Sequence, residues 1–366
     1  MNELKMNTLI KRYISRCSFA LALVLAVGCS EKDDPEVPGG DEGIETVITF
    51  RVTKEPVASR ATLPGSQNEQ HVRDVQLYIF NGTGDNAVCV ASENIGWAEH
   101  FGNPLPTDSE EMTYRVKYKG FSAGSPYTFL AVGVDDNAGG TYGLPAGVVV
   151  NSTTLSGAVA TLAGGDSNWK AMRMSELFAG NTVLTPDQKG FSGRVELKRR
   201  VAGVMGWFTN VPSQIGATAT SAIRITLYTL QNKSVTLVPL SQSPVFKDYV
   251  NSPLGGSTGG NVLVEIPIPA GTTSSSKLYG GAYVLPVPAP PVVNSNDYSV
   301  KIEIVDAGGN VLYTQRMKLS ANDVLDPTTS SGTGIIDTEG VYRYPIIANH
   351  FYSIGSSAQP LSIVIN

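Results

Sequence analysis

Short runs that alternate between apolar and polar residues recur along the whole chain, and they constrain the fold more than any other feature. Successive side chains of a β-strand point to opposite faces, so each run predicts a strand with one buried and one polar face. Gly-rich turns separate the runs, as in antiparallel sandwich sheets. The pattern therefore predicts an all-β protein. The runs are residues 44–53, 75–79, 114–119, 223–227, 262–268 and 298–304.

Four other segments refine this prediction. Residues 127–132 are apolar throughout and predict a central strand, while Gly308-Gly309 lies between two predicted strands and predicts a hairpin. Residues 167–178 predict a short helix within a connection. The alternation from 193 to 208 shifts phase at Arg199-Arg200, which indicates a bulge or a crossing between domains.

Length and composition fit two β-rich domains. The 366 residues allow one large or two medium domains, and charged residues make up only 16%. Gly (38) and Pro (22) are abundant, which favours short strands joined by turns. The net charge of -5 argues against a nucleic-acid partner, because such binding depends on Lys and Arg. We expect sandwich-like domains at residues 44–192 and 193–366.

The N-terminus predicts export and lipidation. Residues 1–28 form a signal with a basic start and an apolar stretch that is too short to span a membrane. Small residues precede Cys29, as in a lipobox, so Cys29 is expected to carry lipid and become the mature N-terminus. An ordinary cleaved signal with an incidental cysteine is the alternative. Residues 29–43 are acidic and contain Pro and Gly, which predicts a flexible linker.

The sequence contains no motif from which a catalytic site could be predicted, so we expect no enzyme, no cofactor and no metal. Common catalytic and nucleotide-binding motifs are missing, and the histidines are not at metal-ligand spacing. The carboxylate pairs Glu110-Glu111 and Asp135-Asp136 are expected in solvated turns. Cys89 is expected to be a small buried hydrophobe. The histidines are His71, His100 and His350.

An exposed aromatic platform would instead indicate a glycan-binding protein, because aromatic rings stack on sugars. The candidates are Trp97, Trp169 and Trp207, which are scattered along the sequence. Scattered tryptophans more often pack in or at the rim of a core. Their exposure therefore discriminates between these alternatives.

Several segments together resemble the fimbrillin family, which builds type V pili. The resemblance spans the chain, although each motif is short and degenerate. It implies two tandem transthyretin-like, Greek-key β-sandwich domains after a lipoprotein signal. The segments are the lipobox at Cys29, the strand 44–54, the Arg60-Ala61 bond in a loop of small residues, the strand 71–80, and the segments 195–202 and 347–352.

The resemblance also implies a processing step. In this family an arginine-specific protease cuts after the first strand, which here means cleavage at Arg60-Ala61 and release of residues 29–60. Loss of the first strand would open an apolar groove that a strand of a neighbouring subunit can fill. The alternative is that Arg60 is one more loop arginine. The apolar residues of the displaced strand are Ile44, Ile48, Phe50 and Val52.

The function implied is that of a structural fimbrial subunit: first a lipid-anchored precursor at the outer membrane, then part of a cell-surface fimbrium. Its expected partners are other fimbrial subunits and, through the lipid, the outer membrane. A tip subunit would also bind a host or bacterial surface ligand. The short segment after residue 352 favours the tip over the stalk, and the stalk over the anchor. The alternatives are a fimbrial anchoring subunit and a cell-surface glycan-binding lipoprotein.

Overall fold

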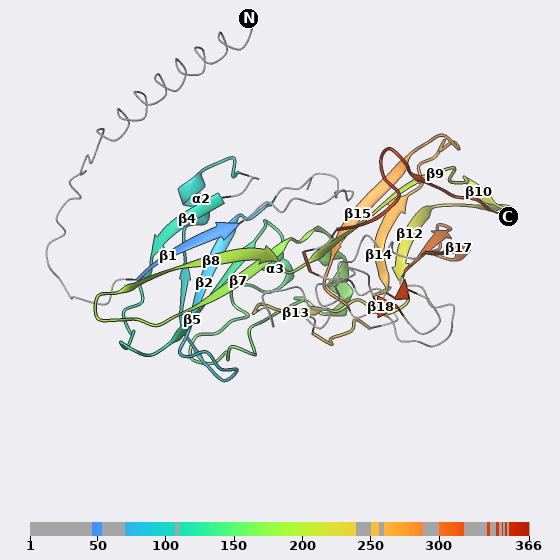
Figure 1. The fold of residues 1–366 in the computed structure, drawn as a ribbon. Helices are drawn as coiled ribbons and strands as arrows, with labels where there is room; N and C mark the ends of the chain where they lie inside the picture. The colour runs from blue at the N-terminus through green and yellow to red at the C-terminus, as the bar shows by residue number, and fades with distance from the viewer. Residues whose placement is uncertain are drawn as a thin grey trace, which may run out of the picture. The chain divides into compact units, whose positions relative to one another are not determined.

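Strands dominate the described part of the chain and its helices are short (Figure 1), which confirms the all-β class. This computed structural model describes residues 46–52, 70–106, 110–238, 250–255, 260–287, 300–317, 335–336, 342–343, 346, 348–349 and 351–365. All of them belong to one compact unit, residues 44–366. The predicted signal and linker lie outside the described residues.

Seven of the strands before residue 200 form one sheet in the order β3-β2-β5-β7-β8-β1-β4. β8 connects its two parts, because β8 pairs along β1 while its last residues, Lys198 and Arg199, pair with β7. The strands are β1 (Thr46–Val52), β2 (Asp74–Phe80), β3 (Cys89–Asn94), β4 (Glu110–Arg115), β5 (Tyr127–Val134), β7 (Leu177–Leu184) and β8 (Phe191–Arg199).

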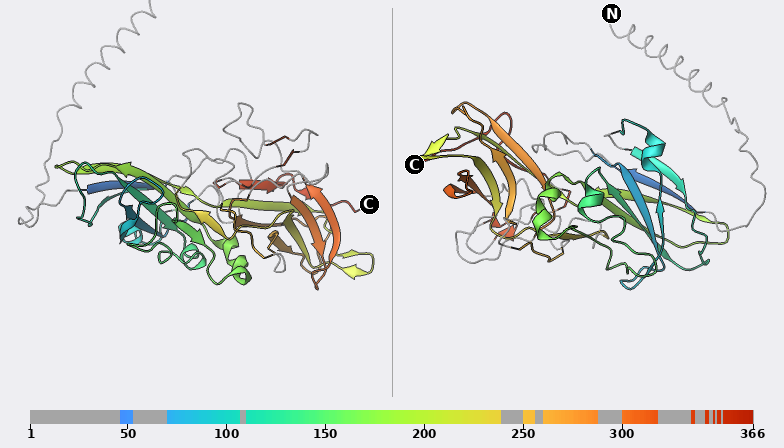
Figure 2. Two further views of the ribbon diagram at one scale, coloured as in Figure 1. Left: turned by 90° about the horizontal axis from the view of Figure 1, so that it is seen from below. Right: turned by 180° about the vertical axis from the view of Figure 1, so that it is seen from behind.

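Two four-stranded sheets follow residue 200 (Figure 2). One is antiparallel, in the order β14-β12-β16-β17. In the other, β9 pairs antiparallel with β15 and parallel with β20 and β21. The strands are β9 (Ala202–Thr209), β12 (Ala222–Leu227), β14 (Val262–Pro267), β15 (Leu278–Val284), β16 (Val300–Val305), β17 (Val311–Met317), β20 (Phe351–Ile354) and β21 (Leu361–Ser362).

Smaller elements complete the described fold. The expected helix at 167–178 is the 3-10 helix η1 (Asp166–Met174), after which the chain enters β7. None of the helices in the described ranges has the length and hydropathy of a membrane span. The other elements are α2 (Trp97–Phe101), α3 (Ala138–Thr141), and the strand pairs β6 (Val159–Thr161) with β13 (Ser234–Thr236), β10 (Gln214–Ile215) with β11 (Thr218–Ala219), and β18 (Ile335–Ile336) with β19 (Tyr342–Arg343).

Five of the alternating runs correspond to the strands β1, β2, β12, β14 and β16, while the run 114–119 overlaps β4 only at residues 114 and 115. β4 begins earlier than predicted, so Glu110-Glu111 lie in a strand rather than in the expected turn. It also ends earlier, because the backbone N–H groups of Lys117 and Tyr118 donate to the Glu93 carboxylate instead of to a strand. The predicted hairpin at Gly308-Gly309 is confirmed between β16 and β17.

Three clusters of buried side chains form the core. One lies among β1, β4 and β8 and one face of β2, β5 and β7, and another lies between the sheets after residue 200. The third covers the opposite face of β2, β5 and β7, where Tyr78, Leu130 and Leu177 are buried. Because buried side chains pack on both faces of β5, the prediction of a central strand is confirmed. The third cluster also corrects the expectation that the run 75–79 has one polar face, because Tyr78 on that face is fully buried.

The phase shift at Arg199-Arg200 coincides with a break between two strands, because β8 ends at Arg199 and β9 begins at Ala202. Both arginines are buried, and the Arg200 Nε donates to the carbonyl of Thr236 at 3.0 Å. The division into domains at residues 192 and 193 stays a prediction.

Candidate functional site: the slot of the first strand

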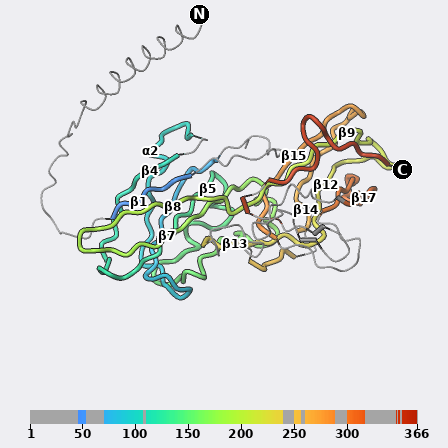
Figure 3. The backbone as a smooth tube through the Cα atoms, viewed as in Figure 1, coloured from blue at the N-terminus to red at the C-terminus, as the bar shows by residue number. Residues whose placement is uncertain are grey.

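β1 lies inside the sheet, between β4 and β8, and not at an edge (Figure 3). It pairs antiparallel with β4 and parallel with β8, and Phe50 is level with Met112 on one side and Val195 on the other. We call the space that β1 fills the β1 slot. Without β1, both neighbouring strands would present a row of unpaired backbone groups to this slot.

The inner face of β1 is buried in the core. Ile48, Phe50 and Val52 are fully buried, and they belong to one cluster with Phe129 and Leu197. The structure therefore brings together three of the residues predicted for the displaced strand. Ile44, the lipidation residue Cys29 and the predicted cleavage residues Arg60 and Ala61 lie outside the described residues.

The outer face of β1 carries charged neighbours. Arg51 is level with Glu111 on β4 and with Glu196 on β8, so a cation stands between two carboxylates. Arg194 on β8 forms an ion pair with Glu111 on β4. Because these strands flank β1, the ion pair crosses the outer face of β1 between the levels of Thr49 and Arg51.

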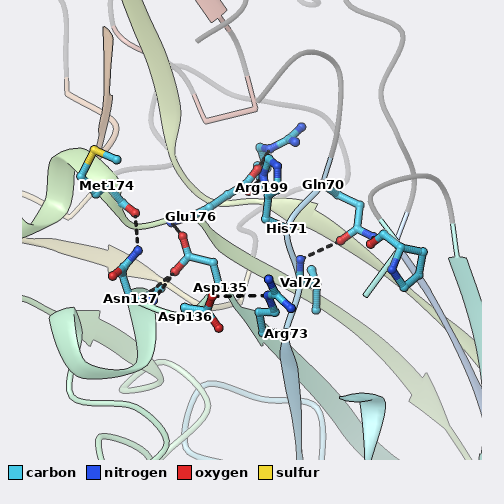
Figure 4. A network of polar contacts seen from close by, with 12 residues as sticks. Gln70, His71, Val72, Arg73, Asp135, Asp136, Asn137, Met174, Glu176 and Arg199 are labelled. Carbon is cyan, nitrogen blue, oxygen red and sulfur yellow. Dashed lines mark hydrogen bonds and ion pairs between the residues drawn. The ribbon is translucent and has the colours of Figure 1, made fainter. Parts of the chain in front are cut away.

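A buried ion pair between Arg199 and Glu176, both drawn in Figure 4, lies just beyond the end of the β1 slot. Val52 is level with Leu197, and two residues later Arg199 pairs with Glu176. Their side chains are only 2% and 1% exposed, and the Nδ1 of His71 lies 2.7 Å from Glu176 Oε2. A charge taken out of water requires such partners, because isolated burial is very costly.

Aromatic rings complete the environment of Arg199. Its guanidinium lies 5.2 Å from the ring centre of Phe178 on β7 and 5.3 Å from that of Phe351 on β20, as in cation–π contacts. The backbone N–H of Glu176 donates to Asp135, and burial raises the pKa of the Asp135 carboxyl. The network therefore connects the seven-stranded sheet with the sheet of β9.

Sequence reasoning did not find this network. It interpreted Arg199-Arg200 only as a phase shift, and it gave His71 and Glu176 no role. The available signal was two consecutive arginines in an otherwise apolar alternating segment, since a charge at a buried strand position requires a counter-charge. That signal predicts a buried carboxylate as counter-charge, but it does not identify which Asp or Glu this is.

The remaining polar candidates have ordinary structural surroundings. Asp135 Oδ1 accepts hydrogen bonds from the backbone N–H groups of Asn137 and Ala138, as in an Asx turn. His100 is exposed on α2, and His350 lies outside the described residues. Within the described ranges, no three His, Cys, Asp or Glu side chains come close enough together to hold a metal ion.

The tryptophans do not form a shared exposed platform. Trp97 and Trp169 are buried, and Trp207 is half-buried against the exposed ring of Tyr279 at a centroid distance of 4.5 Å. A flat, accessible aromatic surface is what stacking on a sugar requires. The burial of two of the three indoles therefore argues against the glycan-binding alternative in the form that the sequence suggested.

Cys89 is a free, fully buried thiol, in agreement with its expected role as a small hydrophobe. Burial raises the pKa of this thiol, so the reactive thiolate is scarce at neutral pH. In a chain of residues 30–366, where Cys89 is the sole cysteine, we expect thiol-reagent labelling about 100-fold slower than in the urea-unfolded chain. Equal labelling rates before and after unfolding would contradict this burial.

Comparisons with known proteins identify a family and structural relatives. Residues 41–349 match the family model described as fimbrillin-A associated anchor proteins Mfa1 and Mfa2. A search of curated proteins found no match. The fimbrial anchor protein Mfa2 from Porphyromonas gingivalis is 12% identical, with a TM-score of 0.42, over 85% of this chain and 89% of that one. A candidate adhesin from Bacteroides thetaiotaomicron VPI-5482 is 12% identical, with a TM-score of 0.46, over 87% of this chain and 94% of that one.

Proposed function

Because the chain belongs to the family of fimbrillin-A associated anchor proteins Mfa1 and Mfa2, we propose that it anchors a surface fimbrium to the outer membrane. The chain is a fimbrial structural protein. The observation that carries the anchor role is the family match from residue 41 to residue 349, which includes β1 and nearly all the described strands.

This proposal reverses the order of preference that the sequence suggested, in which the tip came first. That order depended on the short C-terminal segment and on the Arg60-Ala61 bond. The family description names anchors, and we propose that this anchor keeps its first strand. The buried position of β1 between β4 and β8 is what a retained strand requires, because such a strand completes the sheet and the core.

In the proposed mechanism, lipid on Cys29 holds the chain in the outer membrane and residues 30–43 act as a spacer. β1 stays in its slot, so the anchor accepts no strand there from another subunit. Contact with the adjoining fimbrial subunit then uses another part of the chain. The fimbrium therefore remains attached as long as the lipid and the intervening chain remain intact.

Two substitutions in the native bacterium test this role. With Cys29→Ala, we expect most of the fimbriae in the culture medium instead of on the cells, because the lipid attachment is lost. With Arg60→Ala, we expect attached fimbriae as in the parent strain. Electron microscopy, cell fractionation and the N-terminal sequence of the assembled protein are the measurements, and Cys89→Ala is the control for loss of a cysteine.

The opposite results would favour another position in the fimbrium. An assembled protein that begins at Ala61, with assembly lost in Arg60→Ala, would show an accepting subunit at the tip or in the stalk. Fimbriae that stay cell-bound in Cys29→Ala would contradict the anchor role.

A further inference from the structure

The inner face of the β1 slot selects poorly among strands. It requires apolar side chains at alternate positions, as Ile48, Phe50 and Val52 provide. The C-terminal segment from Leu361 to Ile365 also has apolar residues at alternate positions, namely 361, 363 and 365. An apolar pattern alone therefore does not explain why the slot would hold its own β1 in preference to the C-terminal segment of a second copy.

The outer face of the slot restricts the residue that β1 can place there, because the two neighbouring strands β4 and β8 carry like charges at the same level. Glu111 on β4 and Glu196 on β8 both stand opposite the position that Arg51 occupies. Opposite charges directly across neighbouring strands are favourable and like charges are unfavourable. An acidic residue in place of Arg51 would form a row of three carboxylates.

The ion pair over β1 adds a requirement of size. Arg194 and Glu111 reach toward each other from opposite walls, and Arg194 is level with Thr49. A small side chain at this level leaves room for the two charged groups to meet. β1 supplies a small residue at position 49 and a cation at position 51.

We propose that these outer-face charges make the β1 slot selective for its own strand. The slot takes an extended segment with a basic residue between Glu111 and Glu196 and a small residue two positions earlier. A C-terminal segment from a second copy would present uncharged Ser362 or Val364 there. Arg51 has a carboxylate at the same level on each neighbouring strand, and two such favourable cross-strand neighbours amount to about a two- to thirtyfold preference in an equilibrium constant. The inference rests on the proposed anchor role, in which β1 is retained.

Amide hydrogen exchange of Val47–Val52 tests this selectivity in the chain from residue 30 to 366, because the exchange rate reports how often β1 opens. We expect exchange about threefold faster in Arg51→Gln and about thirtyfold faster in Arg51→Glu. Arg51→Lys should stay within about twofold of the parent. Adding Glu196→Lys to Arg51→Glu should restore most of the protection, and 1 M NaCl should reduce the effect of Arg51→Glu.

Two references separate local opening of β1 from general destabilisation. Lys198→Glu makes the same charge reversal on β8, one position beyond the residue that pairs with Val52, and should leave β1 exchange nearly unchanged. The amides of β12 should exchange equally in all variants. The proposal is wrong if Arg51→Glu opens β1 no more than Lys198→Glu does, or if Glu196→Lys does not rescue it.

The test remains informative whether or not the anchor role holds. If Cys29→Ala leaves fimbriae on the cell while the charge effects appear, the anchor role is wrong and the slot is still charge-selective. If the fimbriae detach and the charge effects are missing, the anchor role stands and its slot does not select by charge.

Discussion

Replacing Arg199 by leucine will lower the free energy of unfolding by about 3–5 kcal/mol, because Glu176 then keeps a buried charge without its main counter-ion. Both side chains are almost completely buried, and the rings of Phe178 and Phe351 flank the guanidinium. Urea unfolding monitored by tryptophan fluorescence gives the measurement. The result matters for function because this pair lies where β8 leads into β9.

Two comparisons make the Arg199 prediction specific. Arg194→Leu removes an arginine that is also paired with a glutamate, but at 48% side-chain exposure, and should cost less than about 1 kcal/mol. The double variant Arg199→Leu/Glu176→Leu should recover much of the loss, because it leaves no unpaired charge in the core. Equal losses in Arg199→Leu and Arg194→Leu would show that burial does not control the energy of this pair.

Phe50→Ala will lower the free energy of unfolding by about 3–5 kcal/mol, because it removes a large ring and leaves a cavity. Phe50 is fully buried in the centre of β1, level with Met112 and Val195. Amide exchange in β1 should rise together with the global loss, since this ring holds the strand in its slot. The same urea unfolding experiment measures the change.

The matched control is Thr49→Ala, the neighbouring residue on the outer face of the same strand. Its side chain is half-buried and its hydroxyl lies 3.3 Å from that of Thr113, so the loss should stay below about 1 kcal/mol. A loss for Phe50→Ala no larger than that for Thr49→Ala would mean that β1 contributes little to the core. The β1 slot could then be empty at small cost.

The alternation of apolar and polar residues located some of the strands, while β3, β7 and β15 were not predicted from it. β1, β12, β14 and β16 follow from it, because period-two burial is a local property of one strand on a half-buried sheet. The hairpin at Gly308-Gly309 was equally local, since Gly309 has a φ of 82° that glycine adopts without strain. The family resemblance came from short motifs along the chain, and the family match agrees with it.

Only the tertiary structure decided which distant strands meet. The parallel partner of β1 is β8, far along the chain, and no local periodicity encodes such a pairing. Local periodicity also does not encode the side chains that pack on the second face of β2 and β5 and bury Tyr78. Nor does it encode the choice of Glu176 as the partner of Arg199. The sequence by itself determined which faces must be buried, because hydrophobicity acts residue by residue. Distant segments determined what covers those faces, because pairing and charge compensation depend on contacts that exist only after folding.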